Sequence, residues 1–137
     1  MAVFEKYDVG LGHVGSYQSS GRPFLSSSLA VPAFAEPPLK ITFETVSRTV
    51  TITNTLPGSA ANVPLRFGFS TNGVKGAVNN NYGVLNNGES FEGEFKVTSV
   101  FLLSDNTNQC SASVIAGLTG ITADRLAANW TGSAGVG

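Results

Sequence analysis

The chain has 137 residues, of which 12% are charged, and its formal net charge is −1. This length supports one domain with a substantial core, and the sparse charge lacks the basic surface needed to bind nucleic acid or an anionic membrane. One cysteine excludes an intrachain disulfide framework, and no window is apolar enough to span a bilayer. So little charge indicates a protein whose surface is largely covered by partners.

Residues 1–38 are rich in Gly, Ser and Pro, with scattered aromatic side chains. The prolines prevent helix formation, and the aromatic residues argue against a solvated, disordered tail. The composition therefore predicts an extended N-terminal arm over 1–38, which lies on its own domain or on a neighbouring subunit.

Regular strand patterns begin at Leu39. Leu39, Ile41 and Phe43 alternate with polar residues, as in a strand with one buried face. The phase then slips, because Val50 and Ile52 fall on even positions. We therefore expect a kink or bulge near 45–47, followed by a strand over 48–54.

The next part of the chain reads as short strands joined by turns. Residues 56–59 predict a turn, and period-two alternation predicts a strand over 63–69 that Pro64 places at an edge or at the start of the strand. Asn72-Gly73 and Asn87-Gly88 both predict tight turns. Between them, 77–85 predicts a weaker strand.

The stretch 91–104 has the strongest strand pattern and is expected to form a hairpin-sized centre of the core. Its first half alternates between apolar and charged residues, and its second half is the apolar run 100–103. Such a run predicts a strand buried on both faces, or one that crosses the middle of a sandwich.

The C-terminal part predicts one more strand and a short helix. In 110–118 apolar Cys110, Ala112, Val114 and Ala116 alternate with Ser111, Ser113 and Ile115. Thr122 suits the N-cap of a short helix over 123–129. Seven or eight short strands without intervening helices predict an all-β protein. The expected fold is an antiparallel β-sandwich of jelly-roll type over 39–121, with the arm before it and the short helix and flexible tail over 122–137 after it.

No motif supports catalysis or a cofactor. The pattern G-x-G-x-x-G occurs at 10–15 but lacks the strand and helix that dinucleotide binding requires. His13 is the single histidine and has no nucleophile elbow to serve. Glu92 and Glu94 share a strand face with Lys96, as on a solvated surface, and the loop at 105–109 matches no calcium-binding pattern. We predict no enzyme activity, no metal and no cofactor.

Two segments together resemble small virion structural proteins of tailed bacteriophages, particularly those of marine bacteria and cyanobacteria. They are YDVGLGHVGSYQSSGRPFL at 7–25 and AGLTGIT at 116–122. The segments KITF, VTITN and KVTSVFL between them are consistent with the β-sandwich of that family. The resemblance implies a non-enzymatic protein on the capsid surface of the virion, bound in many symmetric copies.

The function expected from this resemblance is that of a capsid decoration (cement) protein, whose partners are the major capsid protein and, as a homotrimer, copies of itself. Two alternatives stay open: a tail, neck or adaptor protein of the same particle, and a carbohydrate-binding sandwich module that reads glycans with Asn-rich loops. Neither nucleic acid nor a membrane is expected as a partner. Candidate contact residues are those of the arm and a tryptophan near the C-terminus, namely Tyr7, His13, Tyr17, Arg22, Phe24 and Trp130.

Overall fold

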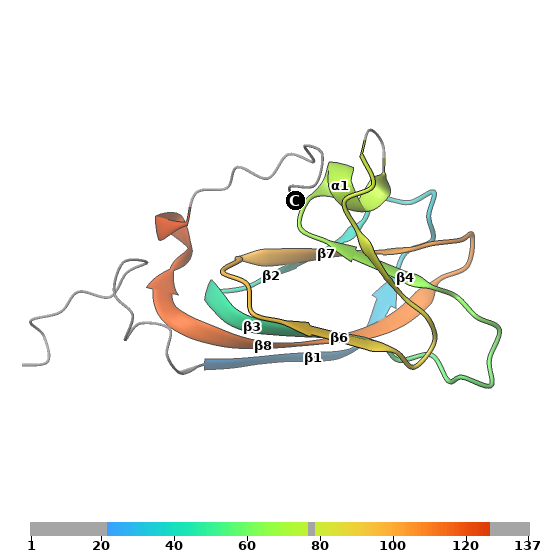
Figure 1. Cartoon of the computed structure of the whole chain (residues 1–137), viewed down its shortest axis with the longest axis horizontal. Coiled ribbons are helices and arrows are strands. Elements are labelled where there is room, and N and C mark those ends of the chain that lie inside the picture. The colour runs from blue at the N-terminus through green and yellow to red at the C-terminus, as the bar shows by residue number, and fades with distance from the viewer. Residues whose placement is uncertain (1–21, 77–78, 127–137) are drawn as a thin grey trace, which may run out of the picture.

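A computed structural model describes residues 22–76 and 79–126, and these residues form an antiparallel β-sandwich, as predicted (Figure 1). One four-stranded sheet, here called sheet A, has the order β1-β8-β3-β6. Sheet B, also four-stranded, has the order β2-β7-β4-β5 and packs face to face with sheet A. The strands of sheet A are β1 (Arg22–Val31), β8 (Cys110–Thr122), β3 (Thr45–Asn54) and β6 (Ser90–Gly93). Those of sheet B are β2 (Leu39–Thr42), β7 (Ser99–Ser104), β4 (Leu65–Gly68) and β5 (Gly83–Leu85).

The alternation predicted over 110–118 is confirmed in β8. Ala112, Val114 and Ala116 are buried between the sheets, while Ser111 and Ser113 lie on the other face. β8 pairs with β1 on one side and β3 on the other, so sheet A is built around two long central strands. Because successive side chains of a strand point to opposite faces, this pairing also determines which residues share the outer face.

The phase slip predicted near 45–47 is confirmed. The register of β3 against β8 shifts between Thr45 and Ser47 and again between Ser47 and Thr49. The slip has a second cause, since the chain leaves sheet B after Thr42 and joins sheet A at Thr45. A change of sheet presents a different face of the chain to the core, and the sequence records this as a change of parity.

The stretch 91–104 does not form one hairpin-sized unit. Residues 91–93 belong to β6, an edge strand of sheet A, whereas 94–98 are in no strand although the alternation predicted one there; the second half contains β7, an internal strand of sheet B. The apolar run is buried in the middle of sheet B, as expected for a strand that crosses a sandwich. The two halves lie in different layers because each pairs with strands distant in sequence (Figure 1).

Part of the stretch predicted as an arm is a strand. Arg22–Val31 forms β1 at the edge of sheet A and pairs with β8 from Arg22↔Leu118 to Val31↔Cys110. The register shifts between Ser26 and Leu29, and Ser28 has a positive φ of 56°. A Ser-rich sequence has weak strand propensity on its own, so the long partner β8 and this bulge allow it to pair.

One of the two predicted tight turns is wrong. Asn72 and Gly73 lie in the short helix α1 (Thr71–Lys75), where the Ser70 hydroxyl caps the helix by accepting a hydrogen bond from the Gly73 N–H. Gly76 ends the helix in the left-handed conformation, with φ of 70°. At Asn87-Gly88 the turn is confirmed: Gly88 has φ of 81°.

The expected C-terminal helix begins as predicted. Ala123–Arg125 is a 3-10 turn that follows Thr122, although the Thr122 side chain makes no capping hydrogen bond. Leu126, which follows this turn, is extended, so the turn ends at Arg125 and the longer helix predicted over 123–129 is not formed at this position. Residues 127–129 lie outside the described residues.

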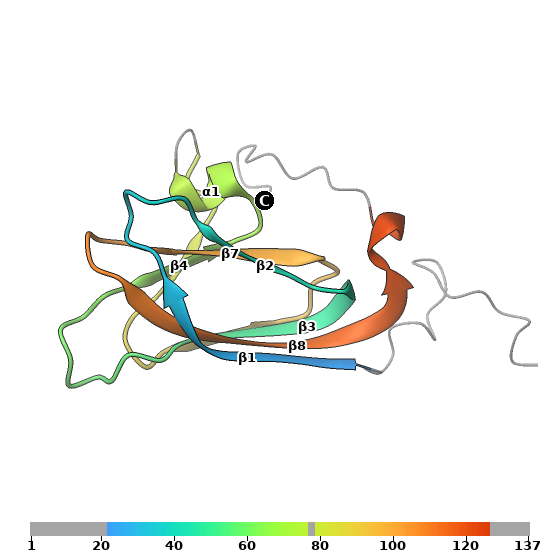
Figure 2. The same cartoon turned by 180° about the vertical axis from the view of Figure 1, so that it is seen from behind.

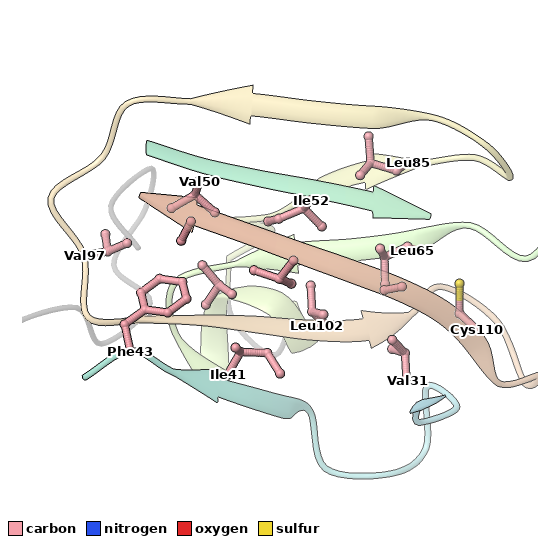
Figure 3. Close-up of a cluster of buried hydrophobic side chains, with 14 of the residues drawn as sticks. Val31, Ile41, Phe43, Val50, Ile52, Leu65, Leu85, Val97, Leu102 and Cys110 are labelled. Carbon is pink, nitrogen blue, oxygen red and sulfur yellow. The ribbon is translucent and has the colours of Figure 1, made fainter. Parts of the chain in front are cut away.

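The core between the sheets is formed by apolar side chains from both layers (Figure 3). Ile52, Leu65 and Leu102 are fully buried there. Buried Asn54 is the main polar exception, and its side-chain amide donates to the carbonyl oxygens of Val63 and Leu85, both at 3.0 Å. The bond to Leu85 joins sheet A to β5 of sheet B, the bond to Val63 holds the segment before β4, and both satisfy a polar group that would otherwise be costly to bury.

Four phenylalanine rings close one side of the sandwich. Phe67 stacks on Phe91, with ring centroids 4.7 Å apart, and Phe69 packs on Phe95 at 5.2 Å. Two glycines make room for these rings. A Cβ at Gly83 would lie 2.3 Å from the Phe67 ring, and a Cβ at Gly93 would lie 2.4 Å from that of Phe95.

Candidate functional site

The outer face of sheet B is covered over β4 and β7 by other parts of the chain. The helix α1 packs over β4 and β7 on the side away from sheet A (Figure 1). Leu103 alternates with the core residue Leu102 and so points outward, yet it is fully buried, as is Val74 of α1. This face is therefore a small second core.

Arg66 fixes this cover in place. Its guanidinium lies over the rings of Tyr82 and Phe34, 4.1 and 4.8 Å from their centroids. It also pairs with the Asp105 carboxylate at 2.5 Å and donates to the carbonyl oxygens of Val74 and Lys75 at the end of α1. A cation at a helix C-terminus is favourable, and this one joins parts of the chain that are far apart in sequence.

The outer face of sheet A has no such cover among the described residues (Figure 2). Leu25 of β1 lies directly opposite Ile115 of β8, and Ile115 lies opposite Thr51 of β3. Leu25 is 70% exposed and Ile115 is 47% exposed. Two large apolar side chains therefore form an exposed pair on this face, between the edge strand β1 and its neighbour β8.

The positions around this pair that share the face by register on β1, β8 and β3 are uncharged, although β3 also carries Arg48, which pairs with Glu94, and β1 begins with Arg22. A shallow hollow of about 330 Å³ lies beside the pair, lined also by Ser26, Ser27 and Ser113. Among the described residues of β1, β8 and β3 that share the face by register, all are small, hydroxylated or apolar: Pro23, Leu25, Ala30, Thr49, Thr51, Thr53, Ser111, Ser113, Ile115 and Gly117. We call these ten residues the sheet A outer face. Glu92 of β6, opposite Thr51, adds a carboxylate at its border.

The residues of this face suit contact with another surface better than catalysis. Hydroxyl and apolar side chains cost less to desolvate than charged ones, and β-branched threonines lose little side-chain freedom on contact. Exposed apolar side chains grouped within a polar surround are typical of interaction sites. The face can therefore bind a broad, uncharged partner surface.

The predicted contact residues are only partly placed. Arg22 forms an ion pair with Glu44, 3.1 Å apart and largely exposed, at the start of β1. The ring of Phe24 packs edge-on against that of Phe43, with centroids 5.1 Å apart, so it is directed toward the protein's own core. Tyr7, His13, Tyr17 and Trp130 lie outside the described residues. Contact roles for all six stay predictions.

Sequence reasoning missed Leu25 and Ile115. A signal was present for Ile115, which interrupts the polar set of Ser111 and Ser113 on the outward face of β8. No comparable signal existed for Leu25, since the arm was not read as a strand.

Other candidate chemistry finds no support among the described residues. Glu94 pairs with Arg48 at 3.7 Å, and both side chains are solvated. No cluster of three or more His, Cys, Asp or Glu side chains that could hold a metal occurs in 22–76 or 79–126. Burial raises the pKa of the Cys110 thiol, opposed by a hydrogen bond with the Ser111 backbone, so the thiol is a core group in its neutral form.

Within the described ranges, no helix combines the length and apolarity needed to cross a bilayer.

The chain matches no protein-family model. No curated protein is significantly similar to it in sequence.

Proposed function

We propose that this protein is a non-enzymatic virion structural protein that decorates and cements a bacteriophage capsid, and that the sheet A outer face is its attachment surface. The observation that carries the proposal is the exposed Leu25–Ile115 pair on a face with few charges, in a domain whose opposite outer face is covered over β4 and β7. The resemblance of 7–25 and 116–122 to phage virion proteins supplies the kind of particle.

Such a face is suited to the weak, many-fold repeated contacts by which a cement protein binds a shell. Each subunit makes contacts of modest strength, and symmetry repeats them many times over a shell. A flat surface of serine, threonine and apolar groups can lie against a shell without leaving a buried unpaired charge. The homotrimer and the major capsid protein as partner are the parts of the proposal that rest on the resemblance.

The first test is the copy number of this protein in purified virions, relative to the major shell protein, by quantitative mass spectrometry. Near-stoichiometric abundance, on the order of hundreds of copies, is expected for a decoration protein on a closed symmetric shell. A dozen copies or fewer would indicate a tail, neck or adaptor protein. Absence from the particle would overturn both virion functions.

The second test locates the attachment surface. Ile115→Asp should abolish binding to capsids that lack this protein, measured by co-sedimentation, because a buried unpaired carboxylate is costly. Val84→Asp is the matched control, since Val84 is 44% exposed but lies on the outer side of sheet B. Equal binding by the two variants would exclude the sheet A outer face as the attachment surface.

A truncation tests the predicted arm separately. Deletion of 1–21 removes Tyr7, His13 and Tyr17 but leaves β1, which begins at Arg22, intact. If the arm tethers each subunit to the shell, the truncated protein should keep its thermal unfolding temperature and lose capsid binding. Unchanged binding would remove the arm from the attachment mechanism.

A further inference from the structure

A second hollow, of about 280 Å³, lies away from the sheet A outer face. It opens beside the end of β4 and the segment that leads into β5, both in sheet B. Three aromatic side chains line it, those of Phe67, Phe69 and Tyr82, together with Asn80 and Asn81. The proposed attachment to a capsid does not use this hollow.

The aromatic walls are held in place before any ligand arrives. Phe67 and Phe69 pack on the rings of Phe91 and Phe95. Tyr82 has the Arg66 guanidinium 4.1 Å from its ring centroid. Since these rings are fixed by the fold, a ligand would not lose affinity by ordering them.

Two glycines complete the hollow: a side chain at Gly83 would clash with a neighbouring ring, and one at Gly68 would be a tight fit. A Cβ at Gly83 would lie 2.3 Å from the Phe67 ring. A Cβ at Gly68 would lie 3.0 Å from the Asn81 carbonyl oxygen. The aromatic side chains of the hollow therefore lie next to glycine backbone, with no other side chain between them.

The lining chemistry selects a neutral ligand. Tyr82 is the one titratable side chain among the described lining residues, and the nearby Arg66 is paired with Asp105. A side-chain amide such as that of Asn80 both donates and accepts hydrogen bonds, which matches hydroxyl groups. The negative face of an aromatic ring attracts the positive hydrogens of a C–H face. A sugar ring presents both features, a C–H face and hydroxyls at its rim.

We propose that this hollow binds one or two pyranose units of a neutral saccharide, with the aromatic rings against the sugar's C–H face and the Asn80 side chain bonded to its hydroxyls. The volume is at the lower end of ligand pockets, which begin at about 300 Å³, and so suits a short saccharide. Asn80 is exposed and available for this role. The sugar is either free or part of a surface polysaccharide.

The test is a titration of the full-length, ¹⁵N-labelled protein with maltotriose, cellotriose, chitotriose and mannotriose, followed by NMR. One of these should give saturable amide shifts at 67–69 and 80–83, with a Kd on the order of 0.1–1 mM. Asn80→Ala should weaken binding by about 3- to 10-fold, the effect of one lost hydrogen bond. Asn108→Ala, an exposed asparagine in the β7–β8 loop, is the control and should leave the Kd unchanged.

The proposal is overturned if none of the four saccharides gives saturable shifts at these residues, or if Asn80→Ala binds as tightly as the wild type. Competition by a bacterial surface polysaccharide would identify a polymer as the source of the sugar, and binding without such competition would identify the free saccharide. Copy number in virions is measured independently, so failure of this titration leaves the proposed attachment to a capsid standing.

Discussion

The outer faces of the two sheets follow the same alternation of side chains, but the outward apolar residues are buried on one and exposed on the other. On sheet B, the outward Leu103 is fully buried beneath α1, and Arg66 joins the cover to the strands. On sheet A, the outward Ile115 is 47% exposed and lies opposite the still more exposed Leu25. An apolar residue on an outward strand position can be covered by the chain itself, as Leu103 is, or remain exposed among the described residues, as Ile115 does.

The largest expected difference in stability is between two truncations to alanine, one on each outer face. Leu103→Ala should lower the free energy of unfolding by about 2–5 kcal/mol, because it opens a cavity under α1. Ile115→Ala should lower it by less than about 1 kcal/mol, because that side chain is already half in water. Denaturant unfolding of both variants measures the difference. Similar losses would mean that the sheet A outer face is also part of the protein's own core.

The next test removes the cation that holds the cover of sheet B. Arg66→Ala should cost about 2–3 kcal/mol, somewhat below the value for a fully buried pair, since the Asp105 side chain is 33% exposed. Arg22→Ala at the edge of sheet A, whose ion pair with Glu44 is largely solvated, should cost less than about 1 kcal/mol. Equal losses in denaturant unfolding would contradict the role given to Arg66.

The smallest expected effects concern exposed polar contacts on each face. Lys75 donates to the Phe34 carbonyl oxygen at 2.8 Å and lies 5.2 Å from the Phe34 ring centroid. Lys75→Ala should cost about 0.5–1 kcal/mol. Thr53→Ala, which removes an exposed hydroxyl contact with Ser90 on sheet A, should stay within about 0.5 kcal/mol of the wild type. Thermal unfolding resolves the two, and the reverse order would show that sheet A depends more on its surface contacts.

Strands with a clean period of two could be predicted from the sequence, because alternation reports directly which face is buried. The pattern in β8 and the phase slip before β3 are examples. The assignment of 91–104 to two sheets could not be predicted, since it depends on pairing with strands remote in sequence. The strand β1 was missed for a related reason: its Ser-rich sequence needs β8 as a partner. At Asn72-Gly73 the capping serine at position 70 outweighed the turn signal.

The candidate site was less predictable than the fold. Ile115 stood out within a polar set, but its meaning depends on Leu25, 90 positions earlier in the chain and brought opposite by register. The hollow beside β4 likewise combines residues from 67–69 and 80–83 that have no common pattern. Patterns in the sequence describe one strand at a time, whereas a surface is formed by residues of several strands that pairing brings side by side.

The pairing of β1 also has a consequence for synthesis on the ribosome. β1 is the first described strand to emerge, but its partner β8 does not begin until Cys110. At about 5–20 residues per second, the 79 residues from Val31 to Cys110 impose a delay of roughly 4–16 s. During that interval the backbone of β1 has no strand of its own domain to pair with. Its run of serines has weak strand propensity, so the unpaired segment is a poor template for another nascent chain until β8 is made.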